Sequence, residues 1–206
     1  MKRTKKPAGV IILPARLHHD DVPGHIKLDV GPKPFVVLTN DPSFTGWGWV
    51  VLDANSKILE AGAIQTKPDD KKLRIRKGDD TVRRTAEILK VLLGIIKKHK
   101  VTYLVSELPH GSQNAQGAIM IGIVVGIAQS ISDALEIPIE YYSEADAKGA
   151  IAGKDVVSKA KMIALIKGLF EVPWTGVKYK DEAIADALAI YNVAIQQSPT
   201  LKLMKK

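Results

Sequence analysis

The strongest constraint on the fold of this chain comes from two short apolar runs that both end on an acid. Residues 35–38 are Phe-Val-Val-Leu, and Asp41 follows three residues later. Residues 101–106 are Val-Thr-Tyr-Leu-Val-Ser, and Glu107 follows at once. Apolar runs rich in β-branched and aromatic residues predict buried strands, so we expect one strand over 34–40 and another that ends on Glu107.

The segments around these two runs predict an α/β domain. Two further strands, 47–53 and 58–66, are joined by a loop of turn residues, so the first three strands should be antiparallel. Apolar residues at helical spacing predict a helix over 81–100. The rest of the chain predicts one more strand, 137–143, and helices over 115–135, 144–151, 156–170 and 180–197.

The composition fits one domain with basic ends. The 206 residues are 46% hydrophobic, which is enough to bury one sizeable core. We predict a basic arm over 1–33, a folded domain over 34–196 and a basic tail over 197–206. The net charge of +8 favours a polyanionic partner, and charge alone does not choose between nucleic acid and an anionic membrane. The absence of Cys excludes disulfides and thiolate metal sites, so a metal ion would have to bind oxygen or imidazole.

The location expected from the sequence is cytoplasmic, with association to the nucleoid, an organelle or a virus-infected host cell as alternatives. The basic start of the chain leads only to a brief apolar patch that Pro14 interrupts, which is unlike a secretory signal. The longest uncharged apolar stretch, 117–131, falls short of the roughly 20 residues that a membrane span needs. We interpret it as a buried or partner-covered helix and expect no membrane.

A third group of acids lies at the start of the last predicted helix. Asp181 and Glu182 are favoured there because acids near a helix N-terminus interact well with the helix dipole. Asp186 stands between two alanines on an apolar helix, where a charge tends to be paired or metal-bound.

Taken alone, Asp41-Pro42-Ser43 would suit an ordinary type I turn. Two strands that end on acids, with further acids on a helix packed against them, instead predict one cluster of carboxylates. Such a cluster repels itself and is stabilised by hard divalent cations such as Mg²⁺. Two such ions can activate a water and stabilise the leaving oxygen in phosphodiester cleavage. A basic chain with an acidic centre therefore predicts a nuclease.

The order of these motifs resembles the RuvC-type Holliday-junction resolvases, crossover junction endodeoxyribonucleases of the ribonuclease H-like superfamily. The stretch from Asp41 to Gly48 is similar to the family's first motif, a strand ending Asp-Pro-Gly/Ser that continues to Thr-Gly-Tyr/Trp-Gly. The stretch from Glu107 resembles the catalytic Glu followed by a loop and an Asn-Ala helix start at residues 114 and 115. Residues 185–190, Ala-Asp-Ala-Leu-Ala-Ile, resemble the last motif, whose Asp is a metal ligand.

This resemblance covers about residues 34 to 195. It implies a mixed five-stranded sheet flanked by helices and a two-metal Mg²⁺ site, in which Mn²⁺ can substitute. The catalytic and metal-binding residues it implies are Asp41, Glu107 and Asp186. The family commonly has a further acid or His three residues before the last Asp, where this chain has Ala183. Glu182 lies on the same helical face as Asp186 and is our substitute, with Asp181 as the alternative.

The same resemblance implies that branched DNA, above all the four-way junction, is the partner of a homodimer. Lys148 and Lys159 match family lysines that contact DNA, and His110 stands where the family often has a base-stacking aromatic. The DNA-binding residues we expect are His110, Ser112, Gln113, Asn114, Lys148 and Lys159. The basic segment 71–84 is a solvated face by default and otherwise part of one phosphate-binding surface.

Three other functions remain to be weighed. The chain could cut other branched DNA or RNA–DNA hybrids with the same fold. It could be a junction-binding protein without turnover, for which Ala183 is the best evidence. A sugar-kinase or actin-like ATPase half also begins with a strand that ends in Asp, but the chain lacks the Gly-rich phosphate loops of that class.

Overall fold

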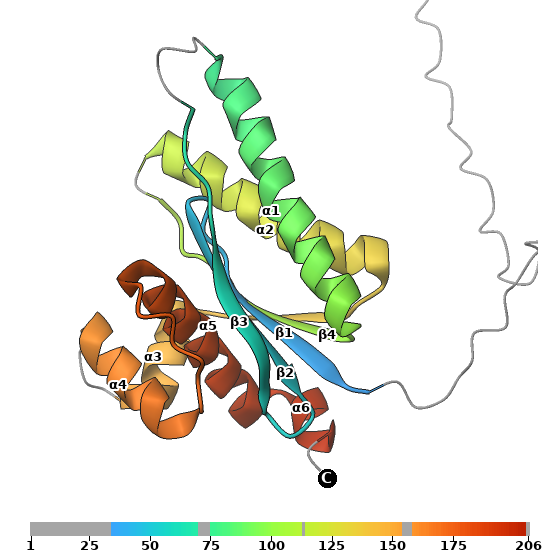
Figure 1. Ribbon diagram of the computed structural model, residues 1–206, viewed down its shortest axis with the longest axis vertical. Helices are drawn as coiled ribbons and strands as arrows, with labels where there is room; N and C mark the ends of the chain where they lie inside the picture. The colour runs from blue at the N-terminus through green and yellow to red at the C-terminus, as the bar shows by residue number, and fades with distance from the viewer. Residues whose placement is uncertain (1–33, 70–74, 113, 154–157, 205–206) are drawn as a thin grey trace, which may run out of the picture. The chain divides into compact units, whose positions relative to one another are not determined.

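The computed structural model describes residues 34–69, 75–112, 114–153 and 158–204, which form a five-stranded sheet with helices on both faces (Figure 1). They lie in the compact unit Lys33–Lys206, and the expected arm over 1–33 lies outside the described residues. The strands are β1 (Val36–Asp41), β2 (Gly46–Asp53), β3 (Ile58–Gln65), β4 (Tyr103–Glu107) and β5 (Ile139–Tyr142). The helices are α1 (Lys77–His99), α2 (Ala115–Leu135), α3 (Glu144–Ala152), α4 (Lys159–Leu169), α5 (Lys178–Gln197) and α6 (Pro199–Met204).

The order of strands across the sheet is β3-β2-β1-β4-β5. β1 pairs antiparallel with β2, and β2 with β3, as expected for the first three strands. β4 joins the sheet beside β1 and runs parallel to it, with Asn40 opposite Ser106. Because the residues after this last pair are Asp41 and Glu107, the two acids end neighbouring strands at the same edge of the sheet. The expected mixed α/β sheet is confirmed.

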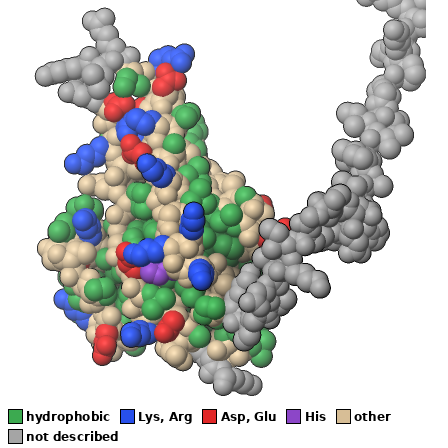
Figure 2. Space-filling model, turned by 45° about the vertical axis from the view of Figure 1, so that its right-hand side comes forward, with side chains coloured by type: hydrophobic (Ala, Val, Ile, Leu, Met, Phe, Trp, Pro, Cys, Tyr) green, Lys and Arg blue, Asp and Glu red, His purple; other side chains and the backbone are tan. Residues whose placement is uncertain are grey.

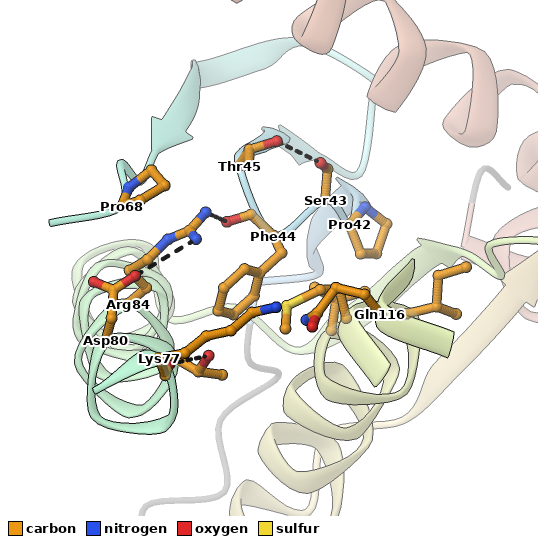
Figure 3. A pocket seen from close by; sticks show the side chains of 13 residues that line it. Pro42, Ser43, Phe44, Thr45, Pro68, Lys77, Asp80, Arg84 and Gln116 are labelled. Carbon is orange, nitrogen blue, oxygen red and sulfur yellow. Dashed lines mark hydrogen bonds and ion pairs between the residues drawn. The ribbon is translucent and has the colours of Figure 1, made fainter. Parts of the chain in front are cut away.

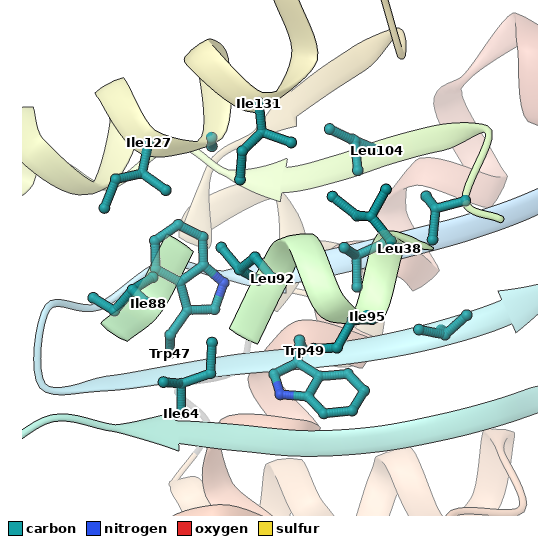
Figure 4. Packing of buried hydrophobic residues seen from close by; sticks show 14 of the residues in the cluster. Leu38, Trp47, Trp49, Ile64, Ile88, Leu92, Ile95, Leu104, Ile127 and Ile131 are labelled. Atoms are coloured by element: carbon teal, nitrogen blue, oxygen red, sulfur yellow. The ribbon is translucent and has the colours of Figure 1, made fainter. Parts of the chain in front are cut away.

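Strand alternation divides the buried side chains into two cores, one on each face of the sheet. Leu38, Trp47 and Leu104 point to the face covered by α1 and α2, where they pack with Leu92 and Ile127 (Figure 4). Val37, Val50 and Val105 point to the opposite face and pack against α3, α4, α5 and α6. Because both faces are covered, β1 is buried from Val36 to Asn40, and only its last residue reaches the edge.

The predicted element boundaries need small corrections. β1 includes Asp41, and β5 begins at Ile139 rather than at residue 137. α1 begins at Lys77, four residues before the predicted start, because Asp79 and Asp80 suit a helical first turn.

The basic tail expected over 197–206 forms a short helix in its described part. Leu201 of α6 is buried in the core that α5 covers, and its backbone N–H donates to Ser198 Oγ. The buried Leu201 and this hydrogen bond thus hold the start of α6 against the core.

The helix α2 corrects the expectation that its apolar stretch is too short for a membrane span. It runs for 21 residues and could cross a membrane by length and composition alone, because the helix extends beyond 117–131 at both ends. One face, with Val124, Ile127 and Ile131, packs into the core. Only 28% of the apolar window is buried, so the other face is an exposed apolar surface.

A single glycine sets the position of α5 over the sheet. Gly48 of β2 lies opposite Asp41, and a Cβ atom added there would be 2.1 Å from the backbone oxygen of Ala183. A helix backbone can approach a strand this closely only where the strand has no side chain. Gly48 thereby allows the first turns of α5, with Asp186, to lie beside the carboxyl end of β1.

We predict that Gly48→Ala destabilises the protein by about 1–3 kcal/mol, because the added methyl group must push α5 away from the sheet. Gly46→Ala is the matched control, since a Cβ there meets no atom within 4 Å. Urea unfolding followed by circular dichroism compares the two. Equal midpoints for both variants would show that α5 is not held by this contact.

Candidate active site

A cavity of about 260 Å³ gathers four acids from four different elements. Asp41 comes from the end of β1, Glu107 from the end of β4, Glu144 from the start of α3 and Asp186 from the third turn of α5. The remaining lining residues are Ala147, Lys148, Lys159, Met162 and Ala189. Three of the acids predicted from the sequence therefore lie around one cavity together with the two predicted lysines.

A second hollow, of about 430 Å³, adjoins the first and holds Glu182. It shares Asp41, Lys159 and Asp186 with the first cavity. Glu182 Oε2 lies 3.5 Å from Lys159 Nζ, and only 20% of the Glu182 side chain is exposed. Ala183 lines this hollow too. The position where the resembling family commonly carries a metal ligand therefore borders the hollow, but an alanine side chain has no atom that can bind a metal ion.

Asp181 has a different environment from Glu182. Its Oδ1 accepts hydrogen bonds from the backbone N–H and the hydroxyl of Thr175, and its Oδ2 accepts one from the backbone N–H of Gly176. It lines neither hollow. The side chain ties the preceding turn to the start of α5, so its geometry favours Glu182 over Asp181 as the further acid.

Burial and mutual repulsion raise the pKa values of the three predicted carboxyl groups. The pKa of Asp41 lies well above its ordinary value, first because of burial and then because of Glu107 and Asp186. Burial, followed by the charges of Glu144 and Asp186, raises the pKa of Glu107 to about 7. The pKa of Asp186 is raised by burial, an effect that the charge of Lys159 opposes.

Both predicted DNA-contacting lysines pair with acids at the rim of the cavity. Lys148 Nζ donates to Glu144 Oε1 one helical turn earlier on α3, and Lys159 pairs with Glu182. About half of the Lys148 side chain and 69% of the Lys159 side chain are exposed. Both ammonium groups can therefore be reached by a phosphate at the cavity mouth.

The loop after Glu107 is built around the start of α2. Asn114 Oδ1 accepts a hydrogen bond from the backbone N–H of Gly117 and caps the helix, while Ser112 Oγ accepts one from the backbone N–H of Asn114. Both side chains shape the loop, and the side chain of His110 is exposed on it. Gln113, also expected to bind DNA, lies outside the described residues.

The turn between β1 and β2 is held by a buried arginine. Arg84 of α1 donates to the backbone oxygen of Phe44 and to Thr66 Oγ1, and its guanidinium lies 4.3 Å from the centre of the Phe44 ring. Figure 3 shows it beneath this turn, at the edge of a cavity of about 460 Å³ that α1 and α2 also line. These contacts fix the backbone that follows Asp41.

The basic segment 71–84 does not form an unbroken basic surface in its described part. Arg76 pairs with Asp79, and Arg83 pairs with Asp69, Asp80 and Glu87. Figure 2 shows the same mixture on one face, where basic side chains lie next to acidic ones. The solvated face expected by default describes these residues better. Residues 71 and 72 and Arg74 lie outside the described part.

The donor set fits a hard divalent cation. The acids around the two hollows offer carboxylate oxygens only, which are the ligands that Mg²⁺ and Mn²⁺ prefer. Among the described residues, no three acids or histidines stand close enough to hold one ion as they are placed, and the lysines supply the positive charge in the cavity. Burial first, and then repulsion from neighbouring acids, raises the pKa values of Asp41 and Glu107, and a bound cation would oppose both effects.

The mixed sheet, with acids at the carboxyl ends of β1 and β4 and on α5, defines a ribonuclease H-like domain. Residues 37–195 match the family model of the crossover junction endodeoxyribonuclease RuvC. The chain belongs to this family, which is one of nucleases whose catalysis depends on divalent metal ions. The expected resemblance is thereby confirmed.

Relatives and solved structures agree with this assignment. The RuvC proteins of Chlorobium phaeobacteroides and Desulforamulus reducens are each 27% identical to the chain, covering 79% and 80% of it and 86% and 96% of their own lengths. Thermus thermophilus RuvC, solved in complex with a Holliday junction substrate, superposes with a TM-score of 0.59 at 20% identity, over 77% of this chain and 92% of that one. The yeast mitochondrial Holliday junction resolvase superposes with a TM-score of 0.57 at 13% identity, over 82% of this chain and 81% of that one. These structures support the fold.

The sequence analysis missed Glu144. It begins a helix directly after Ser143, and the first residues of helices commonly carry acids for reasons of capping and dipole. The acid at position 144 is therefore already explained by the helix start, and the sequence alone does not indicate a role in the site. The useful signal is Lys148, which lies four residues later and so shares a helical face with Glu144.

We predict that Glu107→Gln stabilises the metal-free protein at about pH 8 and that this advantage disappears by about pH 4. The folded-state pKa of about 7 lies above the ordinary value of 4.5. The folded state thus binds the proton more tightly, and wild-type stability falls as pH rises between these two values. Thermal melts of both proteins in EDTA measure the difference. A difference that is the same at every pH would contradict the raised pKa.

Proposed function

We propose that this chain resolves four-way DNA junctions by paired, Mg²⁺-dependent nicks and acts as a homodimer. The observation that carries the proposal is the cavity where Asp41, Glu107 and Asp186 lie together with Lys148 and Lys159. The acids can bind a divalent cation, and the lysines beside them can bind a DNA phosphate. The match to the RuvC family model over residues 37–195 supports the choice of substrate.

Asp41, Glu107 and Asp186 are the proposed catalytic metal ligands, with Glu182 as the fourth. Two divalent ions in such a site activate a water and stabilise the leaving oxygen of the phosphodiester. The side chains come from β1, β4 and α5, which are fixed by the two cores, so their backbones are held in place and only the side chains need to adjust around an ion. Mn²⁺ takes similar oxygen ligands and is expected to replace Mg²⁺.

Lys148 and Lys159 are proposed to hold the phosphate backbone on either side of the scissile bond. Lys148 lies within α3 and Lys159 is the first residue of α4, and both line the same cavity. Contacts of this kind position DNA without reading its sequence. His110, Ser112, Gln113 and Asn114 are proposed to approach the strand from the loop that precedes α2.

The homodimer is proposed to form through the exposed face of α2. Ala118, Ile119, Gly122 and Gly126 lie on this face and are exposed, with Ile119 at 55%. An apolar surface with small residues allows close helix packing and marks an interaction site. A two-fold dimer presents two copies of the cavity to the two-fold symmetric strands of a junction, which suits paired nicks.

A second candidate function is junction binding without turnover. Ala183 favours it, because this residue lines the second hollow without offering a ligand. Glu182 lines the same hollow and is proposed to compensate.

Incubation with a labelled four-way junction and a matched linear duplex, in Mg²⁺ and in EDTA, distinguishes the two functions. Symmetric nicks in the junction alone, in Mg²⁺ alone, support the resolvase. Tight junction binding on native gels without nicks in either Mg²⁺ or Mn²⁺ would support the binding protein. Equal cutting of flaps, forks or hybrids would assign a different substrate to the same site.

We predict that Asp41→Asn and Glu107→Gln lower the nicking rate at least about 1,000-fold while junction affinity stays equal or rises, because fewer negative charges then face the DNA. Lys148→Ala and Lys159→Ala should weaken junction binding, each lowering the slope of log K against log salt by about 0.9. Lys90→Ala is the control for these two variants, because Lys90 is an exposed lysine on α1. Loss of binding in the two acid variants, with the fold intact, would contradict this division of roles.

We predict that Ile119→Asp converts the dimer into a monomer, because a charge in an apolar helix interface is costly to bury. Leu169→Asp on α4 is the matched control, since both side chains are 55% exposed. Light scattering after size-exclusion chromatography gives the mass. A monomeric wild-type chain, or an Ile119→Asp variant that stays dimeric, would rule out this interface.

A further inference from the structure

Glu144 lies at the mouth of the active-site cavity in a fixed position. It is the first residue of α3, and the helix start is held by a capping box in which Ser143 Oγ accepts from the backbone N–H of Asp146 and Asp146 Oδ2 accepts from the backbone N–H of Ser143. About half of its side chain is exposed. The capping box leaves the Glu144 carboxylate available, because other groups satisfy the helix start.

The position of Glu144 is central among the acids of the cavity. Its charge opposes ionisation of Glu107 more than that of Asp186 does, and it opposes ionisation of Asp186 more than that of Glu182 does. It also lines the cavity with both residues. Among the described residues, Glu144 is therefore the further carboxylate that lines the cavity together with Glu107 and Asp186.

The other candidate acid serves a different part of the site. Glu182 lines only the second hollow, beside Asp41 and Asp186, and Glu107 is absent from that hollow. Ala183 offers no donor. Within the described part of the chain, the cavity that contains Glu107 has no fourth carboxylate other than Glu144.

Glu144 is at present paired with Lys148, one of the two lysines proposed to hold DNA. Both side chains are about half exposed, and exposed ion pairs of this kind contribute little to stability. Replacing one partner of such a pair by another charge therefore costs little. A divalent cation is a stronger partner for the carboxylate, and a phosphate is a suitable partner for the lysine.

We infer that Glu144 is a further metal-site carboxylate in this chain, and that it exchanges Lys148 for the cation, which releases Lys148 to the DNA backbone. The inference rests on the proposed function and adds a residue and a coupling to it. Metal binding and DNA binding then favour each other, and the coupling is reciprocal. No covalent step is involved, since one ion pair is replaced by two others.

The first test measures Mn²⁺ binding to the full chain without DNA, by electron paramagnetic resonance of the unbound ion. We expect Glu144→Gln to weaken Mn²⁺ binding about 10-fold or more, as loss of a group from a metal site commonly does. Glu144→Asp should restore part of the affinity. Glu171→Gln is the matched control, because Glu171 is exposed and lies away from both hollows. Melting curves in EDTA verify that each variant folds.

The second test measures junction binding in EDTA, where no cation competes for Glu144. Glu144→Gln should bind the junction more tightly than wild type, with a salt slope steeper by about 0.9, because Lys148 is then unpaired. In a Lys148→Ala background the same substitution should have a much smaller effect. This double-mutant comparison separates the Lys148 contribution from the general loss of negative charge.

The outcomes distinguish this inference from the proposed function. Wild-type junction cleavage together with unchanged Mn²⁺ affinity in Glu144→Gln would overturn the inference and leave the resolvase function in place. Weaker Mn²⁺ binding with an unchanged EDTA junction affinity would overturn the exchange of Lys148. A wild-type chain that neither binds Mn²⁺ nor cuts the junction would overturn the proposed function itself.

Discussion

Repulsion between carboxylates at one edge of the sheet is the constraint on which the rest of this structure depends. Asp41 and Glu107 end neighbouring parallel strands, and α5 brings Asp186 to the same cavity. Each of the three has a raised pKa, first because of burial and then because of neighbouring acids, so their charged forms are costly to hold in this cavity. The two apolar cores, one on each face of the sheet, offset this cost and keep the acids in place. A site that is unfavourable alone becomes favourable when it receives cations, which is a useful property in a metal-dependent nuclease.

The elements of the site are held in place by residues that have no proposed role in catalysis. Gly48 allows α5 to approach β2, and Arg84 fixes the turn that follows Asp41. Asp181 uses its carboxylate to secure the turn before α5, which directs Glu182 rather than Asp181 toward the hollow. Two lysines at the cavity rim pair with acids, and we propose that they bind the phosphates of the DNA backbone. Both ion pairs are partly exposed and weak, and in the proposed function a cation and a phosphate replace the partners in at least one of them.

Much of this could be predicted from the sequence, because strand ends and helix faces follow from the spacing of apolar residues. The buried run before Asp41 and the run before Glu107 gave both strands, and Asp186 was conspicuous between alanines. The order of strands was not predictable, since pairing of β4 with β1 depends on how α1 crosses the sheet. The choice between Asp181 and Glu182 depended on hydrogen bonds to the turn at 175–176, and Glu144 was hidden because acids are ordinary at helix starts. The buried Leu201 depended on a core formed by distant segments.

The most direct test of the central claim is a crystal structure of the chain soaked in Mn²⁺, with the ion located by its anomalous scattering. The account predicts Mn²⁺ in the cavity where Asp41, Glu107 and Asp186 meet, coordinated by carboxylate oxygens at distances typical of first-row metals. Absence of Mn²⁺ from this cavity at saturating concentration, or Mn²⁺ bound only at other surface acids, would contradict the account.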